Sequence, residues 1–390
     1  MSDIGRSVML AAGGTGGHLF PAYALAEELG RRNIAVDLVT DMRGDRYGTG
    51  FPARNVYQVP SATLGGRNPL AMTKTAITLS RGVAAAYALL GRVRPAALVG
   101  FGGYPSFPPI VAARMRGIPA ALHEQNAVLG RANRMLARRV AAIATSFEKV
   151  KLLDGDLAAR ARFTGNPVRD VVRAAAGRPY DTPRPDGPLR IVVFGGSQGA
   201  RFFSDTVPPA LAALPAAVRA RLEVVQQCRE EDLDRVRAAY AAAGIQAELA
   251  HFFRNLPERM AAAHLVVARA GASSVAELTV IGRPSILVPL PHALDNDQLN
   301  NATRLAESGA AWCIEQKDLS PERLAREIEA LAGEARGLQS LQAAAEAARR
   351  LGAPDAVERL ADLVVELMGQ PAGQRSAKGS AMADAGAAPA

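Results

Sequence analysis

Cysteine is scarce in this sequence. The 390 residues include only Cys228 and Cys313, without a CxxC or Cys/His spacing, so neither a disulfide framework nor a zinc site is expected and a reducing compartment fits best. No run of about 18 apolar residues is present, so no membrane span is predicted. The start MSDIGRSVML also lacks the basic and apolar regions of a signal peptide.

Acidic residues are absent from positions 46–123, which carry nine arginines and lysines. The whole net charge of +9 belongs to this segment, because the other 37 basic residues equal the 37 acidic ones. Such a field attracts polyanions, either nucleic acid or an anionic lipid surface. Interleaved aromatic residues and a nucleic-acid recognition motif are both missing, which disfavours nucleic acid as a partner.

Short apolar runs alternate with helical patterns along the chain, as expected for strands buried on both faces of parallel sheets. The predicted strands are 7–12, 35–40, 97–101, 120–124, 141–145, 189–194, 222–226, 246–250, 265–268, 285–288 and 310–314. The rhythm restarts after the proline-rich stretch GRPYDTPRPDGP. The fold class is therefore α/β, with two Rossmann-like doubly wound domains and an interdomain cleft.

The boundaries follow from the same patterns. We expect an N-terminal domain over 1–176, a linker over 177–188 and a C-terminal domain over 189–350. A helix within 351–368 is expected to pack back on the N-terminal domain, and the apolar-poor tail 369–390 is expected to be disordered.

Glycine-rich loops follow the first predicted strand of each half, GGTGGH at 13–18 and GGSQGA at 195–200. Backbone N–H groups in such loops can hold an anion, commonly a diphosphate, at the positive end of the following helix. Neither loop is a P-loop, and Leu19 breaks the GxGxxG spacing of the first. Simple tight turns remain an alternative for both loops.

Two later segments carry suitable chemistry for a nucleotide sugar. RAGASSVAE at 269–277 places Glu277 one turn inside a helix, where it could accept hydrogen bonds from ribose hydroxyls. A solvated helix residue is the alternative reading of Glu277. HALDNDQLNN at 292–301 follows a buried strand and offers amides and carboxylates to sugar hydroxyls.

Several motifs in order give the chain a family resemblance: GGTGGH at 13, GGY at 102, HEQN at 123, GNPVR at 165, GGSQGA at 195, RAGASSVAE at 269 and DxxQxxNA at 295. The chain resembles the peptidoglycan N-acetylglucosaminyltransferase family, which converts lipid I to lipid II and has the GT-B fold. The resemblance implies that the first domain faces the acceptor and the membrane and that the second binds the UDP-sugar donor.

The resemblance also implies individual roles. Asn126 would hold the N-acetylglucosamine, Phe253 the uracil edge, and Gln298 the sugar hydroxyls. The remaining substrate-binding residues would surround the diphosphate and ribose: Thr15, Gly16, Gly17, Arg169, Ser197, Ala272, Ser273, Ser274, Val275, Ala276 and Glu277. Asp297 beside Gln298, Phe253 in place of a smaller aliphatic residue, and the prolines of GGYPSFPP depart from the family pattern.

The implied reaction is inverting transfer of N-acetylglucosamine from UDP-N-acetylglucosamine to the C4 hydroxyl of lipid I, undecaprenyl-diphospho-N-acetylmuramoyl-pentapeptide. His18 is the leading candidate for the general base, since imidazole titrates near neutral pH, and Glu124 is the competing carboxylate. No cofactor is expected. Asp295 and Asp297 form a DxD pattern, but helix N-termini and Arg169 already supply positive charge, so no metal is expected either.

The acceptor that the resemblance implies is a membrane lipid, so the enzyme is expected peripherally at the cytoplasmic face of the inner membrane, with anionic lipid and other cell-wall synthesis proteins as expected partners. The apolar stretch 70–90, with Lys74 and Arg81, suits a helix at the interface or an ordinary core helix. Alternatives to the reaction are a UDP-N-acetylglucosamine 2-epimerase, a natural-product glycosyltransferase or a nicotinamide oxidoreductase.

Overall fold

The computed structural model describes residues 7–13, 16–41, 50–62, 69–196, 200–333 and 335–369. The predicted site residues Thr15 and Ser197 and the residues 370–390 of the expected tail lie outside these ranges. The chain divides into two compact units. Unit 1 runs to Gln125 and continues over Leu129–Thr164 and from Val357 onward, and unit 2 consists of Asn126–Val128 and Gly165–Ala356.

Within the described ranges, unit 1 forms a seven-stranded sheet in the order β3-β2-β1-β4-β5-β6-β7, with every neighbouring pair parallel. Its strands are β1 (Ser7–Ala11), β2 (Ala35–Thr40), β3 (Asn55–Gln58), β4 (Ala97–Gly100), β5 (Ala120–Glu124), β6 (Ala142–Thr145) and β7 (Ala161–Phe163). Its helices are α1 (Gly16–Arg31), α2 (Pro69–Val93), α3 (Phe107–Met115), α4 (Arg131–Leu136) and α14 (Ala356–Gly369).

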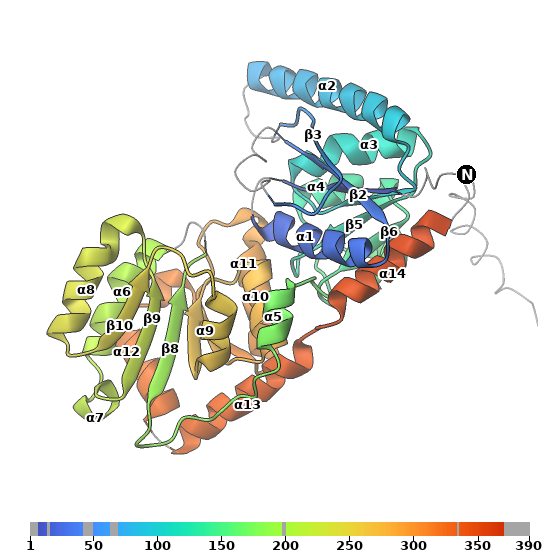
Figure 1. The fold of residues 1–390 in the computed structure, drawn as a ribbon. Coiled ribbons are helices and arrows are strands. Elements are labelled where there is room, and N and C mark those ends of the chain that lie inside the picture. The colour runs from blue at the N-terminus through green and yellow to red at the C-terminus, as the bar shows by residue number, and fades with distance from the viewer. Residues whose placement is uncertain are drawn as a thin grey trace, which may run out of the picture. The chain divides into compact units, whose positions relative to one another are not determined.

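Strand β1 explains why the core of unit 1 has two layers. All of its residues are buried, and successive side chains of a strand point to opposite faces. Val8 and Leu10 join the cluster with α1 and α14, whereas Met9 and Ala11 join the cluster with α2 and α3. Figure 1 shows these two helix pairs on opposite faces of the sheet.

Unit 2 contains a six-stranded parallel sheet, again counted over the described ranges, in the order β10-β9-β8-β11-β12-β13. Its strands are β8 (Leu189–Phe194), β9 (Leu222–Gln227), β10 (Gln246–Ala250), β11 (Leu265–Ala268), β12 (Ser285–Leu287) and β13 (Ala311–Cys313). Its helices are α5 (Asp170–Ala175), α6 (Ala200–Ala212), α7 (Ala216–Arg219), α8 (Leu233–Ala242), α9 (Leu256–Ala262), α10 (Ala272–Ile281), α11 (Asp297–Glu307), α12 (Pro321–Ala332) and α13 (Ala335–Leu351).

The main core of unit 2 lies on one face of its sheet. Leu189, Ile191 and Val193 of β8 pack there against residues of α6, α8 and α12, and Figure 1 shows α9 on the other face of β8. In both units the first strand of the unit lies inside the sheet and the strand order reverses beside it. This is the doubly wound arrangement predicted from the apolar runs, which is thereby confirmed.

The passage between the units differs from the expected linker over 177–188, because the chain enters unit 2 at Gly165. Arg283 supplies a physical reason. Its buried guanidinium donates to the carbonyl oxygens of Arg178 and Pro179, each at 3.1 Å, and also to those of Ala261, Ile281 and Gly282. The start of the proline-rich segment is therefore fixed onto unit 2.

Helix α14 offers a matched test of how much its packing stabilises unit 1. Val364 is fully buried in the core cluster, whereas the adjacent Val365 is 43% exposed. We expect Val364→Ala to lower the free energy of unfolding by about 2 kcal/mol through lost apolar burial and a residual cavity. Val365→Ala should change it by less than about 0.5 kcal/mol. Urea unfolding followed by far-ultraviolet circular dichroism compares the two, and equal effects would contradict the packing described.

Candidate active site

The predicted loops lie where each sheet reverses its order. In unit 1, β1 leads to Gly13 and its neighbour β4 leads to Gly102 and Gly103; in unit 2, β8 leads to Gly195 and its neighbour β11 leads to Gly271. Connections leave such a pair of strands in opposite directions, which opens a crevice at their carboxyl ends. Each reversal is thus bordered by a loop that the sequence predicted to bind an anion: the Gly13 loop in unit 1, and the Gly195 and Gly271 loops in unit 2.

His18 lies in the first turn of α1, and its ring packs against two glycines. A Cβ atom on Gly102 would lie 3.4 Å from His18 Nδ1, and one on Gly103 would lie 3.4 Å from Nε2. Both glycines have positive φ angles, 84° and 68°, a region that favours glycine. Desolvation lowers the pKa of His18, while hydrogen bonds with the Gln125 side chain and the Phe101 carbonyl act in the opposite direction.

Glu124 is buried, and its carboxylate is used within unit 1. Oε2 accepts hydrogen bonds from the Gly130 backbone N–H at 2.9 Å and from Asn133 Nδ2 at 2.7 Å. Gly130 precedes α4, and Asn133 lies in its first turn. The carboxylate therefore fixes the start of a short helix that has no side-chain cap of its own.

Asn126 follows in sequence but belongs to unit 2, where Asn301 fixes it. The Asn301 Nδ2 group donates to Asn126 Oδ1 at 3.0 Å and to the Ala270 carbonyl at 3.1 Å, and Asn301 Oδ1 accepts the Ala127 N–H at 2.8 Å. Asn301 is fully buried in α11. One amide therefore connects Asn126 to the loop between β11 and α10.

Glu277 lies in α10, which begins at Ala272, so residues 272–277 occupy the N-terminal part of this helix. Its side chain is 10% exposed and lies 3.3 Å from Arg169 Nη2. Burial raises the pKa of the Glu277 carboxyl, and the charge and hydrogen bond of Arg169 oppose that rise. The two predicted residues are therefore brought together by the fold.

Gln298 lies in the first turn of α11, and its Oε1 accepts the Leu290 N–H at 3.0 Å. Because the oxygen is engaged, the NH2 group of the amide is the end available to an acceptor. The neighbouring Asp297 carboxylate accepts the Gln298 N–H at 2.7 Å. Burial, together with the charge of Asp295, raises the pKa of Asp297.

The structure places the last predicted residues as follows. Phe253 lies between β10 and α9, with the Arg259 guanidinium 5.6 Å from its ring centroid. Gly16 and Gly17 begin α1. No cluster of three or more His, Cys, Asp or Glu side chains that could hold a metal ion occurs within the described ranges.

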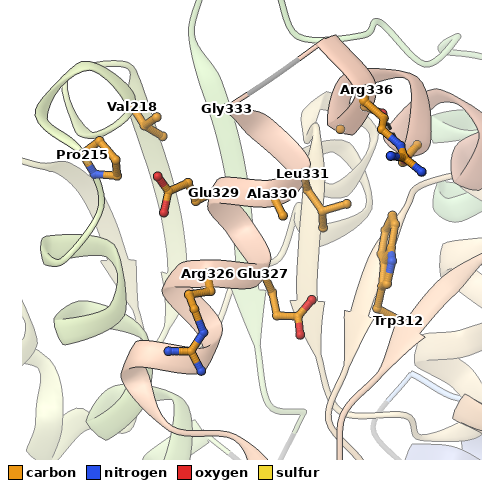
Figure 2. Close-up of a pocket in the computed structure, with 12 residues that line it drawn as sticks. Pro215, Val218, Trp312, Arg326, Glu327, Glu329, Ala330, Leu331, Gly333 and Arg336 are labelled. Atoms are coloured by element: carbon orange, nitrogen blue, oxygen red, sulfur yellow. Dashed lines mark hydrogen bonds between the residues drawn. The ribbon is translucent and has the colours of Figure 1, made fainter.

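An open hollow of about 740 Å³ in unit 2 contains none of these residues. Figure 2 shows α12 crossing it, with Pro215 and Val218 on one side and Trp312 on the other. Pro215 and Val218 precede β9 in the chain, so the hollow lies near the amino ends of the parallel strands. The predicted loops follow the carboxyl ends, so this hollow is separate from the candidate site.

Sequence reasoning did not single out Gln125 and Asn301, although both stand inside quoted motifs. Gln125 comes directly after the buried strand β5, and Asn301 lies in α11; both amide side chains are buried. A buried amide needs hydrogen-bond partners. A glutamine or asparagine next to a buried strand therefore indicates a hydrogen-bonded position, but the sequence does not show which groups are its hydrogen-bond partners.

Two doubly wound units, with glycine loops at both reversals, are the architecture of the GT-B fold, and the comparisons with known proteins show that the chain is a glycosyltransferase of this type. The models of the glycosyltransferase family 28 N-terminal and C-terminal domains match residues 8–145 and 190–360. A relative from Methylobacterium sp. (strain 4-46), named UDP-N-acetylglucosamine–N-acetylmuramyl-(pentapeptide) pyrophosphoryl-undecaprenol N-acetylglucosamine transferase, is 58% identical over 92% of this chain and 96% of its own. The chain belongs to glycosyltransferase family 28 and, within it, to the family of these N-acetylglucosamine transferases.

Solved structures agree with this assignment. The crystal structure of Acinetobacter baumannii MurG matches with a TM-score of 0.76 at 28% identity, over 93% of this chain and 99% of that one. A UDP-GlcNAc 2-epimerase from Neisseria meningitidis matches with a TM-score of 0.63 at 12% identity, over 92% and 100% of the two chains. The second likeness shows a shared fold alone.

Asn301 and its neighbour Asn300 provide a matched test of the buried amide. Asn301→Ala would leave the Ala127 N–H and the Ala270 carbonyl without this partner, and we expect it to destabilise unit 2 by roughly 1 to 3 kcal/mol. Asn300 is only partly buried and donates to the backbone carbonyls of Asp295 and Asn296 just before α11, so Asn300→Ala should cost less than about 1 kcal/mol.

The only tryptophan, Trp312, lies in unit 2, so its fluorescence during urea unfolding reports on this unit. An Asn301→Ala variant as stable as Asn300→Ala would show that the amide network contributes little to unit 2.

Proposed function

We propose that this enzyme transfers N-acetylglucosamine from UDP-N-acetylglucosamine to the C4 hydroxyl of undecaprenyl-diphospho-N-acetylmuramoyl-pentapeptide, with inversion, and so forms lipid II. The observation that carries the proposal is the match, over nearly the whole of both chains, to a relative whose name states this donor and acceptor. The site supports it, because each half supplies groups suited to one part of the reaction.

Unit 2 supplies the donor site in this proposal. The N-terminus of α10, residues 272–277, receives the diphosphate and ribose, because its N–H groups and helix dipole favour an anion. The Ser273 hydroxyl oxygen is buried without a hydrogen-bond partner in the described part of the chain, so it is available to phosphate. Glu277 accepts from ribose hydroxyls, Arg169 neutralises the phosphate charge of departing UDP, and the Ser197 hydroxyl donates a hydrogen bond to the phosphate.

The sugar and base contacts complete the donor site. Asn126 and the NH2 group of Gln298 bind the N-acetylglucosamine, and Phe253 lies along the uracil edge. Unit 1 contributes the loop of Thr15, Gly16 and Gly17 at the diphosphate, with His18 beside it. His18 acts as the general base, since both Glu124 contacts described above use its carboxylate to support α4.

Incubation of the enzyme with labelled UDP-N-acetylglucosamine and a lipid I analogue tests the reaction. The expected product carries one added N-acetylglucosamine in the β configuration, and turnover should survive EDTA because no step uses a metal. Release of UDP only with another acceptor, or formation of the 2-epimer of the donor, would replace the proposal by one of the alternatives. Loss of turnover in EDTA that Mn²⁺ restores would overturn metal independence.

UDP binding tests the roles of Arg169 and Glu277. Arg169→Met removes a charge-assisted contact to phosphate and raises the pKa of Glu277 further, because Arg169 counteracts the effect of burial. We expect about tenfold or greater loss of affinity by calorimetry. The loss of UDP affinity should be larger at low pH, where more Glu277 is protonated in the variant, and should decrease as the pH rises.

Arg173→Met is the matched control, because Arg173 lies in α5, which begins directly after Arg169, and pairs with exposed Asp170. Equal affinities of the two variants, or a loss for Arg169→Met that does not vary with pH, would contradict the coupling of Arg169 to Glu277.

We also propose that α2 holds the enzyme at the anionic cytoplasmic leaflet. No helix in the described ranges is long and apolar enough to cross a membrane. The outer face of α2 exposes Met72 and Ile77, 60% and 55% accessible, close in sequence to Lys74 and Arg81. Such a helix can bury its apolar side chains at the lipid interface while its cations meet anionic headgroups.

Liposome flotation tests the proposed membrane contact. Lys74→Glu/Arg81→Glu should weaken binding to anionic vesicles at least about tenfold, given about 1 kcal/mol for each basic residue near the surface. Lys149→Glu/Lys151→Glu makes the same change in charge at exposed positions of unit 1 outside α2 and should bind nearly as the unaltered chain does. Similar losses for both pairs, or binding indifferent to lipid charge, would remove the role of α2.

A further inference from the structure

Gln125 follows β5 and is 2% exposed, and its contacts fix which way its amide points. Nε2 lies 3.0 Å from the Phe101 carbonyl oxygen, 3.0 Å from the His123 carbonyl oxygen and 2.9 Å from His123 Nδ1. Carbonyl oxygens only accept hydrogen bonds, so the amide end beside them has to be the NH2 group. The opposite orientation would bring the amide oxygen against two other oxygens inside a buried site, which is unfavourable.

The other end of the amide therefore determines the state of His18. Gln125 Oε1 lies 3.1 Å from His18 Nδ1. Because this oxygen can only accept, the hydrogen bond requires a proton on Nδ1. A neutral imidazole has one N–H and one nitrogen with a lone pair, so Nε2 carries the lone pair.

The surroundings of His18 favour the neutral ring. Desolvation lowers its pKa, and its position in the first turn of α1 places it at the positive end of the helix dipole. Gly102 and Gly103 lie along the ring and restrict its orientation. Whether His18 can act as a base therefore depends on which of its two ring nitrogens carries the proton in the neutral form.

We propose that Gln125 is a positioning residue that holds neutral His18 with its proton on Nδ1, so that Nε2 takes the proton of the acceptor hydroxyl. This inference rests on the base role of His18 in the proposed function. The acceptor oxygen bonds to the anomeric carbon as the bond from that carbon to the UDP oxygen breaks, and the electron pair leaves with UDP. The hydroxyl proton moves to Nε2, and Gln125 Oε1 continues to accept from Nδ1–H of the resulting imidazolium.

The tautomer can be observed without altering the chain. The enzyme is labelled with ¹⁵N in its five histidines, and two-dimensional ¹H–¹⁵N spectra distinguish the protonated ring nitrogen from the one with a lone pair. The set of signals that disappears in the His18→Ala variant belongs to His18. The expected pattern at neutral pH is Nδ1–H with an unprotonated Nε2. A proton on Nε2, or a rapid mixture of both tautomers, would overturn the proposal.

Gln125→Met tests the contribution of the amide, since methionine has a similar length and offers no oxygen. We expect the tautomer preference to be lost and kcat to fall by roughly 10- to 100-fold, within the usual contribution of a general base, while KM for UDP-N-acetylglucosamine changes less than about threefold. In the pH profile of kcat/KM, the acid limb should move to lower pH. The deleted hydrogen bond raises the pKa of His18, so its loss leaves the lowering by desolvation less opposed. An unchanged tautomer with unchanged kcat would overturn the proposal.

Gln226→Met is the matched control, because Gln226 is a fully buried glutamine of unit 2 whose Oε1 accepts from Tyr240. It should keep the His18 tautomer and the acid limb even if it lowers stability; a shift like that of Gln125→Met would mean that general destabilisation is the cause.

His18→Ala separates the base role of His18 from the positioning role of Gln125. If it retains kcat, the base role in the proposed function fails, and the catalytic part of this inference fails with it. If it loses kcat while the unaltered enzyme carries its proton on Nε2, the base role stands and only the role of Gln125 fails.

Discussion

The candidate site depends on hydrogen bonds that satisfy buried polar side chains at the carboxyl ends of parallel strands. A polar group removed from water without a partner costs free energy, so each such residue constrains its neighbours. Glu124 fixes the start of α4, Gln125 faces His18, and Asn301 holds Asn126. Three consecutive residues of one motif thus serve three different elements, and one of those elements belongs to the other unit.

The sequence predicted the fold well because strands buried on both faces are mostly apolar, even where single polar residues such as His123 and Glu124 of β5 are buried in them. The interior strands β4, β5 and β6 are buried along their whole length and were all expected as apolar runs. The edge strand β3, NVYQ, is mostly exposed, and its mixed composition gave no comparable signal. The other edge strand of this sheet, β7, was missed as well, whereas β10, an edge strand of the second sheet, was predicted. Strand prediction was therefore complete for the interior strands, where burial determines composition, and uneven at the edges.

Site chemistry was predictable only in part. Loops next to strands can be recognised locally, but hydrogen-bond partners such as His18 and Gln125, 107 positions apart, meet only through the fold. The boundary of unit 2 was missed for a related reason. A proline-rich, charged segment is typical of a solvated linker, yet Arg283, which follows the end of α10, binds the carbonyl groups of Arg178 and Pro179 and is itself 1% exposed. Neither the burial of an arginine nor its choice of carbonyl partners is visible in composition.

The return of α14 to unit 1 affects the order in which the chain can fold during synthesis. Leu360, Val364 and Leu367 complete the cluster that includes β1 and α1, but the ribosome produces them only after residues 165–356 of unit 2. Domains usually fold as units, N-terminal first. Here the core that begins with the first strand stays unfinished until unit 2 has been made, so unit 2 can reach its complete core earlier.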